Sequence, residues 1–334
     1  MNKISFRIVI LFLNVLIFFF SCKSSSNPVL PEDKPVTYNT LFKDTCYANG
    51  FNVSSTNEAN PNIQGRLNYG GSVTAAPVWE IGQWNCINND LLTAKYSYVN
   101  NQHEYRVGTS GNRIAVNTVD GTLTLELNAS TEYGLNGITS NPRKENEPWP
   151  TLLCQYTLSD TRILKISDKK EIRMTIDYKV LKIDNKMPLG TFDANLHSAQ
   201  FQWFITVQNR NTSSSEFGRY IWFGLNFHDL RYDYSPLYAA QDGGKVNNTG
   251  AFIYNADMKS IMSSQGKAEI GKKFSVDVDI LPIVRNAFIL AQQRNFLTET
   301  TWGDLFIGAT NIGWEVPGTY DVAVEINKFD IKYR

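Results

Sequence analysis

Apolar and polar side chains alternate one for one through several segments of this chain. Leu123, Leu125 and Leu127, for example, are separated by Thr124 and Glu126. Successive side chains of a β-strand point to opposite faces, so a period of two predicts strands with one apolar and one polar face. The same pattern runs through residues 171–180, 200–208, 219–229, 274–280 and 320–326. Such strands are typical of antiparallel sheets that pack on one side and meet water on the other.

One segment follows a different period. Between residues 281 and 295, Val284, Phe288 and Ala291 have helical spacing, and Pro282 suits a first helical turn. Glycine-containing turn signals separate the strands at residues 69–71, 120–121, 136–137 and 242–244. Many strands and one helix predict an all-β fold, an antiparallel two-sheet jelly-roll sandwich with one accessory helix at about 281–295.

No linker-like stretch interrupts residues 37–334, and we expect them to form one domain. A small N-terminal unit that ends near Pro77 is the alternative. Residues 302–334, WGDLFIGATNIGWEVPGTYDVAVEINKFDIKYR, resemble the closing strands of concanavalin A-like jelly rolls in secreted carbohydrate-active proteins. The resemblance is carried by that stretch alone. It implies the same sandwich fold and a carbohydrate partner.

The N-terminus has the layout of an export signal. Lys3 and Arg7 precede an apolar run over residues 8–20, which is shorter than the roughly 20 residues a membrane span needs. The run stops at Ser21-Cys22, which resembles the lipobox of bacterial lipoproteins, in an aromatic-rich form similar to those of Bacteroidetes. The resemblance implies a signal peptide over 1–21 and a diacylated Cys22 that anchors the protein to the membrane. An ordinary signal peptide or an uncleaved anchor is the alternative.

Residues 22–36 are dominated by Ser, Pro and charged residues, which is typical of a flexible tether. We therefore expect an exported protein, lipid-anchored in the cell envelope at the outer membrane. No acidic run follows Cys22 directly, so a surface location and a periplasmic one both stay open. Cys46, Cys86 and Cys154 remain in the domain, and an odd number allows at most one disulfide among them.

Charge restricts the partners. Lys plus Arg equals Asp plus Glu at 32 each, so a nucleic-acid partner is not expected, and an uncharged glycan is compatible with this balance. The chain also lacks HExxH, GxSxG and phosphate-cradling glycine motifs. A zinc hydrolase or a serine esterase is therefore not expected.

Two strands carry the clearest candidate binding surface. Opposite their apolar faces, residues 200–208 and 219–229 present amides and a histidine mixed with aromatic rings. Aromatic rings stack on the apolar faces of pyranoses, while amides hydrogen-bond the sugar hydroxyls. The predicted ligand-binding residues are Gln202, Phe204, Tyr220, Trp222, Asn226 and His228, together with Trp149, which flanking prolines stiffen in its loop. The alternative is that loops cover this face. Trp79, Trp84, Trp302 and Trp314 also lie near loops and are weaker candidates for a cleft rim.

Catalysis on the same fold would need two carboxylates about 5–10 Å apart. The outward carboxylates of the predicted strands are Glu126, Asp177, Asp277, Asp279 and Glu325. A lyase would instead need a base near Arg, which His228 and Arg231 supply by type. Jelly rolls often hold one Ca²⁺ through loop oxygens, and Asp242, Asn247 and Asn248 are candidates for such a structural ion. No other cofactor is expected.

The leading hypothesis is a membrane-tethered lipoprotein that captures or positions polysaccharide or oligosaccharide. The first alternative is a polysaccharide-degrading enzyme on the same fold, a glycoside hydrolase or lyase. The second is an envelope structural or interaction protein without a sugar site.

Overall fold

The structure is a computed structural model that describes residues 36–159, 161–243 and 248–334. Met1–Thr37 and Tyr38–Arg334 are separate units, and the architecture below is that of the second. The expected signal peptide, Cys22 and nearly all of the tether lie outside the described residues, as does Asn247. Within the described ranges, no helix has the length and apolar character needed to cross a membrane.

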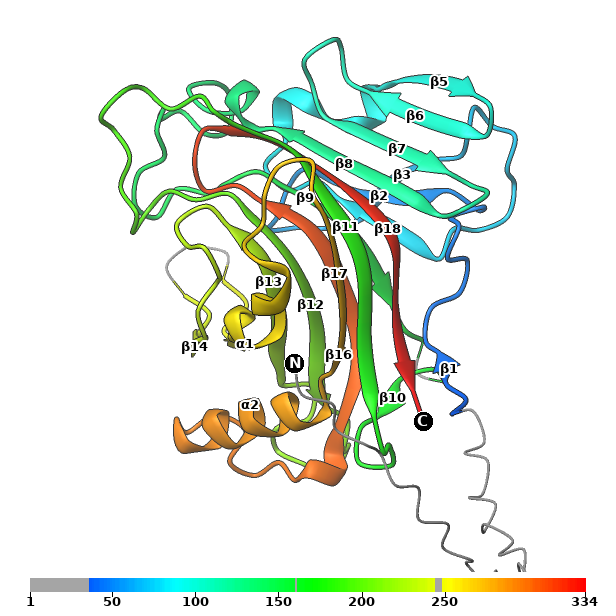
Figure 1. Cartoon of the computed structure of the whole chain (residues 1–334), viewed down its shortest axis with the longest axis vertical. Coiled ribbons are helices and arrows are strands. Elements are labelled where there is room, and N and C mark those ends of the chain that lie inside the picture. The colour runs from blue at the N-terminus through cyan, green and yellow to red at the C-terminus, as the bar shows by residue number, and fades with distance from the viewer. Residues whose placement is uncertain (1–35, 160, 244–247) are drawn as a thin grey trace, which may run out of the picture. The chain divides into compact units, whose positions relative to one another are not determined.

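The smaller of two β-sheets contains the strands β16, β11, β18, β8, β7, β6 and β5, in that spatial order, with β1 beside β18 (Figure 1). Their bounds are β16 Lys273–Asp279, β11 Ile172–Asn185, β18 Tyr320–Tyr333, β8 Thr122–Asn128, β7 Arg113–Asn117, β6 Gln102–Arg106, β5 Lys95–Val99 and β1 Asn39–Thr40. All of these strands pair antiparallel.

The larger sheet has the order β14, β15, β13, β12, β17, β9, β4, β2 and β3, with β10 beside β17. Its strands are β14 Tyr238–Gln241, β15 Phe252–Asn255, β13 Tyr220–Asp229, β12 Gln200–Asn209, β17 Leu305–Glu315, β9 Thr151–Thr157, β4 Trp79–Gly82, β2 Phe51–Ser54, β3 Ile63–Leu67 and β10 Leu164–Lys165. Only the pairs β13–β15 and β2–β4 run parallel.

The chain crosses repeatedly between the two sheets. It passes from the smaller to the larger sheet after β8 and after β11, and returns from β17 to β18. The two sheets pack through their apolar faces, where Tyr178 of β11 lies 5.3 Å from Phe201 of β12 between ring centroids. Trp203 of β12 meets Phe329 of β18 edge-on at 5.3 Å. The fold is therefore the two-sheet jelly-roll sandwich that the alternation predicts.

The predicted helix is also confirmed. α2 spans Leu281–Gln293, begins with Pro282 in its first turn, and buries Val284, Phe288 and Ala291. A second helix, α1 (Met258–Met262), contacts both β13 and β16; it is too short to show a helical period in the sequence. Short 3-10 turns occur at Ile87–Asn89, Leu91–Thr93, Ala129–Thr131, Ser263–Gln265 and Trp302–Asp304.

The cysteines form no disulfide among the described residues. Cys46, Cys86 and Cys154 are free thiols, and the last two are fully buried. Burial raises the pKa of both buried thiols, so they act as small apolar core groups.

Core burial predicts a contrast between two isoleucines. Ile205 on β12 is fully buried between the sheets, whereas Ile289 on α2 is 46% exposed. Ile205→Ala is expected to lower the free energy of unfolding by about 2–5 kcal/mol, because it removes buried methyl groups and leaves a cavity. Ile289→Ala makes the same chemical change at the surface and should cost about 0.5 kcal/mol. Denaturant titration of both variants measures the difference, and equal losses would contradict this packing.

Candidate functional site

The outer face of the larger sheet, which points away from the smaller sheet, collects amides and aromatic rings. Strand register places Glu80, Gln155, Asn311, Phe204, Gly224 and Asn255 in one row across β4, β9, β17, β12, β13 and β15. The next row contains Gly82, Leu153, Gly313, Gln202 and Asn226. We call these two rows and the residues beside them the amide–aromatic face.

Trp222 contacts two other aromatic rings on this face. Trp222 meets Phe204 edge-on at 6.0 Å and Tyr220 at 5.2 Å between ring centroids. Tyr220 and Trp222 are partly exposed, while Phe204 is 8% exposed. Gly224 makes room for this cluster, because a Cβ there would lie 2.3 Å from the Phe204 ring and 2.5 Å from the Asn255 Oδ1 atom. The structure thus brings Phe204, Tyr220 and Trp222 together as the sequence analysis predicts.

Two further tryptophans stand at the opposite end of the face. The Trp149 Nε1 atom donates to Glu315 Oε2 at 3.1 Å, and Glu315 is paired in register with Gln200 on β12. The Trp84 carbonyl accepts from the backbone of Thr151, next to Glu315 in register. Trp149 and Trp84 are both partly exposed. The proline-flanked loop therefore brings Trp149 to the same sheet face. Trp79 and Trp314 belong to the core instead, and Trp302 lies against α2.

Several polar atoms on this face have no hydrogen-bond partner within the described protein. They are Asn226 Oδ1, Asn255 Oδ1, Thr151 Oγ1 and Trp84 Nε1. Asn226 and Thr151 are each 2% exposed and Asn255 is 9% exposed. A buried polar group without a partner costs about 1–3 kcal/mol. These four atoms are therefore the unpartnered hydrogen-bonding groups of this face within the described residues.

His228 departs from the predicted alternation. A β-bulge puts both Phe227 and His228 opposite Phe201, so Asp229, rather than His228, lies opposite Gln200. The His228 ring lies 6.5 Å from that of Trp314, a fully buried core residue. Burial lowers the pKa of His228. The structure thus separates His228 from the row of Gln202 and Asn226, although its Nε2 atom also has no partner among the described groups.

Asp229, the next residue of β13, lies opposite Gln200 and has several hydrogen-bond partners within the protein. It accepts from Ser198 Oγ at 2.7 Å, from Gln200 Nε2 at 2.8 Å and from Arg231 Nη2 at 2.6 Å. Its burial alone would raise its pKa, yet the hydrogen bonds from Arg231 and Ser198 hold it below the ordinary value. Asp229 therefore fixes the loop after β13, and the His228–Arg231 grouping offers no free base–arginine pair.

Glu80 is the carboxylate at the β4 end of the first row. It is half-buried, receives a 3.4 Å hydrogen bond from Gln155 Nε2, and burial raises its pKa. Glu80 pairs with Gln155 of β9, and Glu315 of β17 pairs with Thr151, four residues earlier on β9. Two strand spacings and four residues along the strands therefore separate the two glutamates. Strand geometry puts the Cα atoms of Glu80 and Glu315 about 16 Å apart. Glu315 is engaged by Trp149 Nε1 at the other end of this distance, whereas Glu80 is engaged by Gln155.

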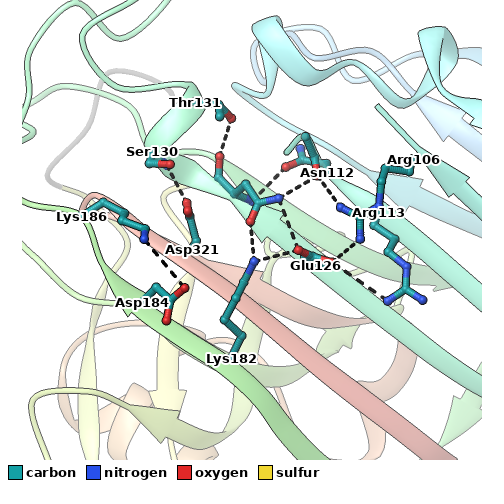
Figure 2. A network of polar contacts seen from close by, with 12 residues as sticks. Arg106, Asn112, Arg113, Glu126, Ser130, Thr131, Lys182, Asp184, Lys186 and Asp321 are labelled. Carbon is teal, nitrogen blue, oxygen red and sulfur yellow. Dashed lines mark hydrogen bonds and ion pairs between the residues drawn. The ribbon is translucent and has the colours of Figure 1, made fainter. Parts of the chain in front are cut away.

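The carboxylates that the sequence analysis considered for catalysis lie on the smaller sheet. Glu126 bonds Arg106 and Lys182, each at 2.7 Å, in the network that Figure 2 shows. Burial would raise the pKa of Glu126, but these two hydrogen bonds lower it. The other four carboxylates also have partners. Asp177 pairs with Lys273, Asp277 with Arg173 and Glu325 with Lys179. Asp279 accepts hydrogen bonds from the backbone N–H groups of Ile172 and Leu281. They stabilise the smaller sheet and are not part of the amide–aromatic face.

No metal centre is evident in the part of the chain that the structure describes, where no three His, Cys, Asp or Glu residues are grouped to hold an ion. Asp242, one of the calcium candidates, accepts from the backbone and the hydroxyl of Thr249 at 2.7 and 2.6 Å. Its carboxylate closes the turn between β14 and β15.

Comparison with known proteins gives similar folds. No protein-family profile and no curated protein matches the sequence. Among solved structures, the family 12 xyloglucanase of Bacillus licheniformis is 14% identical, with 72% of this chain and 97% of that chain covered and a TM-score of 0.39. The endoglucanase cel12A of Rhodothermus marinus is 8% identical (72% and 96% covered, TM-score 0.38). The family 11 xylanase of Neocallimastix patriciarum is 10% identical (72% and 95% covered, TM-score 0.34). At these identities the likeness concerns the fold alone.

The opposite environments of Glu80 and Asp229 predict opposite effects of pH on stability. The Glu80 pKa is raised in the folded state, so its ionisation opposes folding as pH rises through that pKa. Glu80→Gln should therefore increase the free energy of unfolding at pH 7, and the gain should vanish at a pH below the ordinary glutamate value of about 4.3.

Asp229→Asn is the matched variant with the opposite sign. The Asp229 pKa is lowered in the folded state, so its carboxylate stabilises the fold above its ordinary pKa. Asp229→Asn should destabilise the protein at pH 7, with a smaller loss as pH falls through the lowered pKa. Denaturant titrations at several pH values measure both variants. A pH-independent difference for Glu80→Gln would show that this carboxyl is not held in a desolvated site.

Proposed function

We propose that the amide–aromatic face binds a polysaccharide or oligosaccharide chain. The unpartnered oxygens of Asn226 and Asn255, buried beside the ring cluster of Trp222, carry this proposal. Sugar hydroxyls are donors that match such acceptors, and the apolar side of a pyranose matches an aromatic ring. A ligand that offers both groups side by side satisfies this surface better than a purely apolar one.

The arrangement of aromatic groups suits an extended ligand. Tyr220 and Trp222 lie on β13, while Trp84 and Trp149 lie at the opposite end of the face, near β4 and β17. Gln155, Asn311 and Gln202 occupy the strands between them. A chain of sugars that crosses the strands would meet aromatic rings at both ends and amides in between.

Binding without cleavage is the function that this geometry supports best. The middle of the face contains the amides Gln155, which is partly exposed, and Gln202 and Asn311, which are 4% and 9% exposed. An amide neither donates a proton to a leaving group nor forms a glycosyl intermediate under mild conditions. Glycoside hydrolysis needs two carboxyl groups close together, and the backbones of Glu80 and Glu315 are about 16 Å apart in the sheet.

Cleavage of the bound chain is the second candidate. One observation favours it, because the raised pKa of Glu80 is a property of general acids. Incubation with neutral polysaccharides followed by a reducing-end assay separates the two. Sustained release of reducing ends that Glu80→Gln abolishes would establish the enzyme and overturn the binding-only proposal.

The proposal includes a place in the cell. With Cys22 as a lipidated N-terminus and residues 22–36 as a tether, the domain would hold a glycan close to the envelope of the cell. The lipobox-like Ser21-Cys22 sequence supports this part. Mass spectrometry of the protein from a membrane fraction tests it, and a mature protein without acyl chains on Cys22 would overturn it.

Replacement of Trp222 tests the site. Trp222→Ala removes a partly exposed ring of the cluster, and a stacked aromatic side chain contributes about 1.5–3 kcal/mol when it is covered. We therefore expect at least a tenfold loss of affinity in gel retardation or calorimetry with the neutral polysaccharide that binds the wild type. Trp302→Ala is the control, because Trp302 is also partly exposed but contacts Phe288 of α2.

Thermal unfolding of both variants accompanies the binding assay. A folded Trp222→Ala protein with unchanged affinity would contradict the proposal. If Trp222→Ala unfolds the domain, Tyr220→Ala replaces it, with the same expected loss. Failure of the wild type to bind any glycan, together with unfolding by these two substitutions, would favour a structural role for the face.

A further inference from the structure

The strands of the amide–aromatic face contain no Lys or Arg. This holds for β4, β9, β17, β12, β13, β15 and β14, which are adjacent in the larger sheet. The smaller sheet is built in the opposite way, since β5, β6, β7, β11, β16 and β18 each carry at least one Lys or Arg. Both sheets have an outer face in the same domain. The absence of cations is therefore a property of one face and not of the whole chain.

Charges on the smaller sheet are arranged in pairs. Glu126 bridges Arg106 and Lys182 (Figure 2). Glu104 bonds Arg113 at 2.8 Å. Ion pairing of this kind is an ordinary way to make a sheet face soluble. The central strands of the larger sheet carry amides instead of charge pairs. Gln155 is partly exposed, while Gln202, Asn226, Asn255 and Asn311 are 4%, 2%, 9% and 9% exposed.

The charges that remain on the amide–aromatic face are negative. Glu80 has Gln155 as its hydrogen-bond partner, Glu315 accepts from Trp149, and Asp229 is paired with Arg231. A further cation at the Trp149 end is Arg143. Its guanidinium donates to the carbonyls of Lys144, Glu147 and Leu196 and lies 5.1 Å from the Trp149 ring. The middle of the face therefore offers an anionic ligand no cation of its own.

We infer that this face selects uncharged glycans and excludes those with uronate, sulfate or phosphate groups. The inference rests on the proposed glycan-binding function and adds the chemical class of the ligand. An acidic glycan would bring its charges into a site that holds Glu80 and Glu315 and no free cation within the central strands. Recognition of anions in proteins depends on Arg, Lys or clustered backbone N–H groups. A neutral glycan meets only amides and rings and incurs no such repulsion.

A panel of defined polysaccharides tests the selection. Galactomannan, xyloglucan and mixed-linkage glucan are the uncharged probes, while polygalacturonate, alginate and a sulfated galactan are the anionic ones. Affinity gels are run with the full domain at about 20 mM and about 300 mM salt, because screening shortens the range of charge repulsion from about 20 Å to about 6 Å. We expect at least one neutral probe to bind with little salt dependence. Every anionic probe should bind at least tenfold more weakly at low salt.

A charge-insertion variant provides the internal test. Thr157, on β9 next to Ala309 of β17, is exposed on this face and has room for a longer side chain. Thr157→Lys should create salt-sensitive retention on polygalacturonate. Thr157→Gln, similar in length and uncharged, is the matched control and should not bind polygalacturonate.

The outcomes separate this inference from the function on which it rests. If neither neutral nor anionic probes bind the wild type, the proposed function fails. If the wild type binds an anionic probe as tightly as any neutral one, and Trp222→Ala weakens that binding, the glycan site stands and the neutral selection is overturned. If Thr157→Lys gains no anionic binding while neutral binding persists, the lack of cations is not what excludes anions, and the inference is wrong.

Discussion

Burial of the apolar faces between the two sheets is the constraint on which the structure depends. Tyr178 against Phe201 and Trp203 against Phe329 join the sheets through rings that water does not reach. Because strand side chains alternate, each residue fixed in this core fixes its neighbours on the opposite face. A slip of one residue in β12 would bring Gln202 into the core and put Trp203 on the surface. The chemistry of the outer face is therefore set by the packing of the inner one.

The outer faces of the two sheets differ in how their polar side chains are paired. The smaller sheet neutralises its charges in pairs, and Glu126 with its three cationic neighbours is the densest example. The larger sheet keeps amides whose oxygens at Asn226 and Asn255 lack protein partners. Leaving such groups unsatisfied costs free energy. Asn112 Nδ2, next to β7 of the smaller sheet, and Trp314 Nε1 in the core also lack a partner among the described groups, so such atoms are not confined to this face.

Local sequence was sufficient for the strands and for part of the site. Alternation alone predicts β12, β13 and the outward direction of Gln202, Phe204, Tyr220, Trp222 and Asn226. Helical spacing predicts α2, and flanking prolines single out Trp149. Each of these features lies within a few residues of sequence, where the backbone period decides the outcome.

Features that depend on distant pairing were not predictable in this way. Glu80, Gln155 and Asn311 share a row only because β4, β9 and β17 pair in one register, and each lies far from the others in sequence. The bulge at Phe227 adds one residue to β13 and so shifts His228 away from the face, which no local pattern reveals. The carboxylates on β8, β11, β16 and β18 face outward as expected, but on the other sheet. Sheet membership comes from topology and not from alternation.

Indole N–H resonances of the tryptophans give the most direct test of where a glycan binds. A ¹H–¹⁵N spectrum is recorded during titration with an oligosaccharide cut from whichever neutral probe the domain retains. Binding across the larger sheet should move the signals of Trp84, Trp149 and Trp222, while those of the buried Trp79, Trp203 and Trp314 and of Trp302 beside α2 stay in place. Saturable binding that leaves the first three signals unmoved would place the glycan elsewhere on the protein and contradict this interpretation.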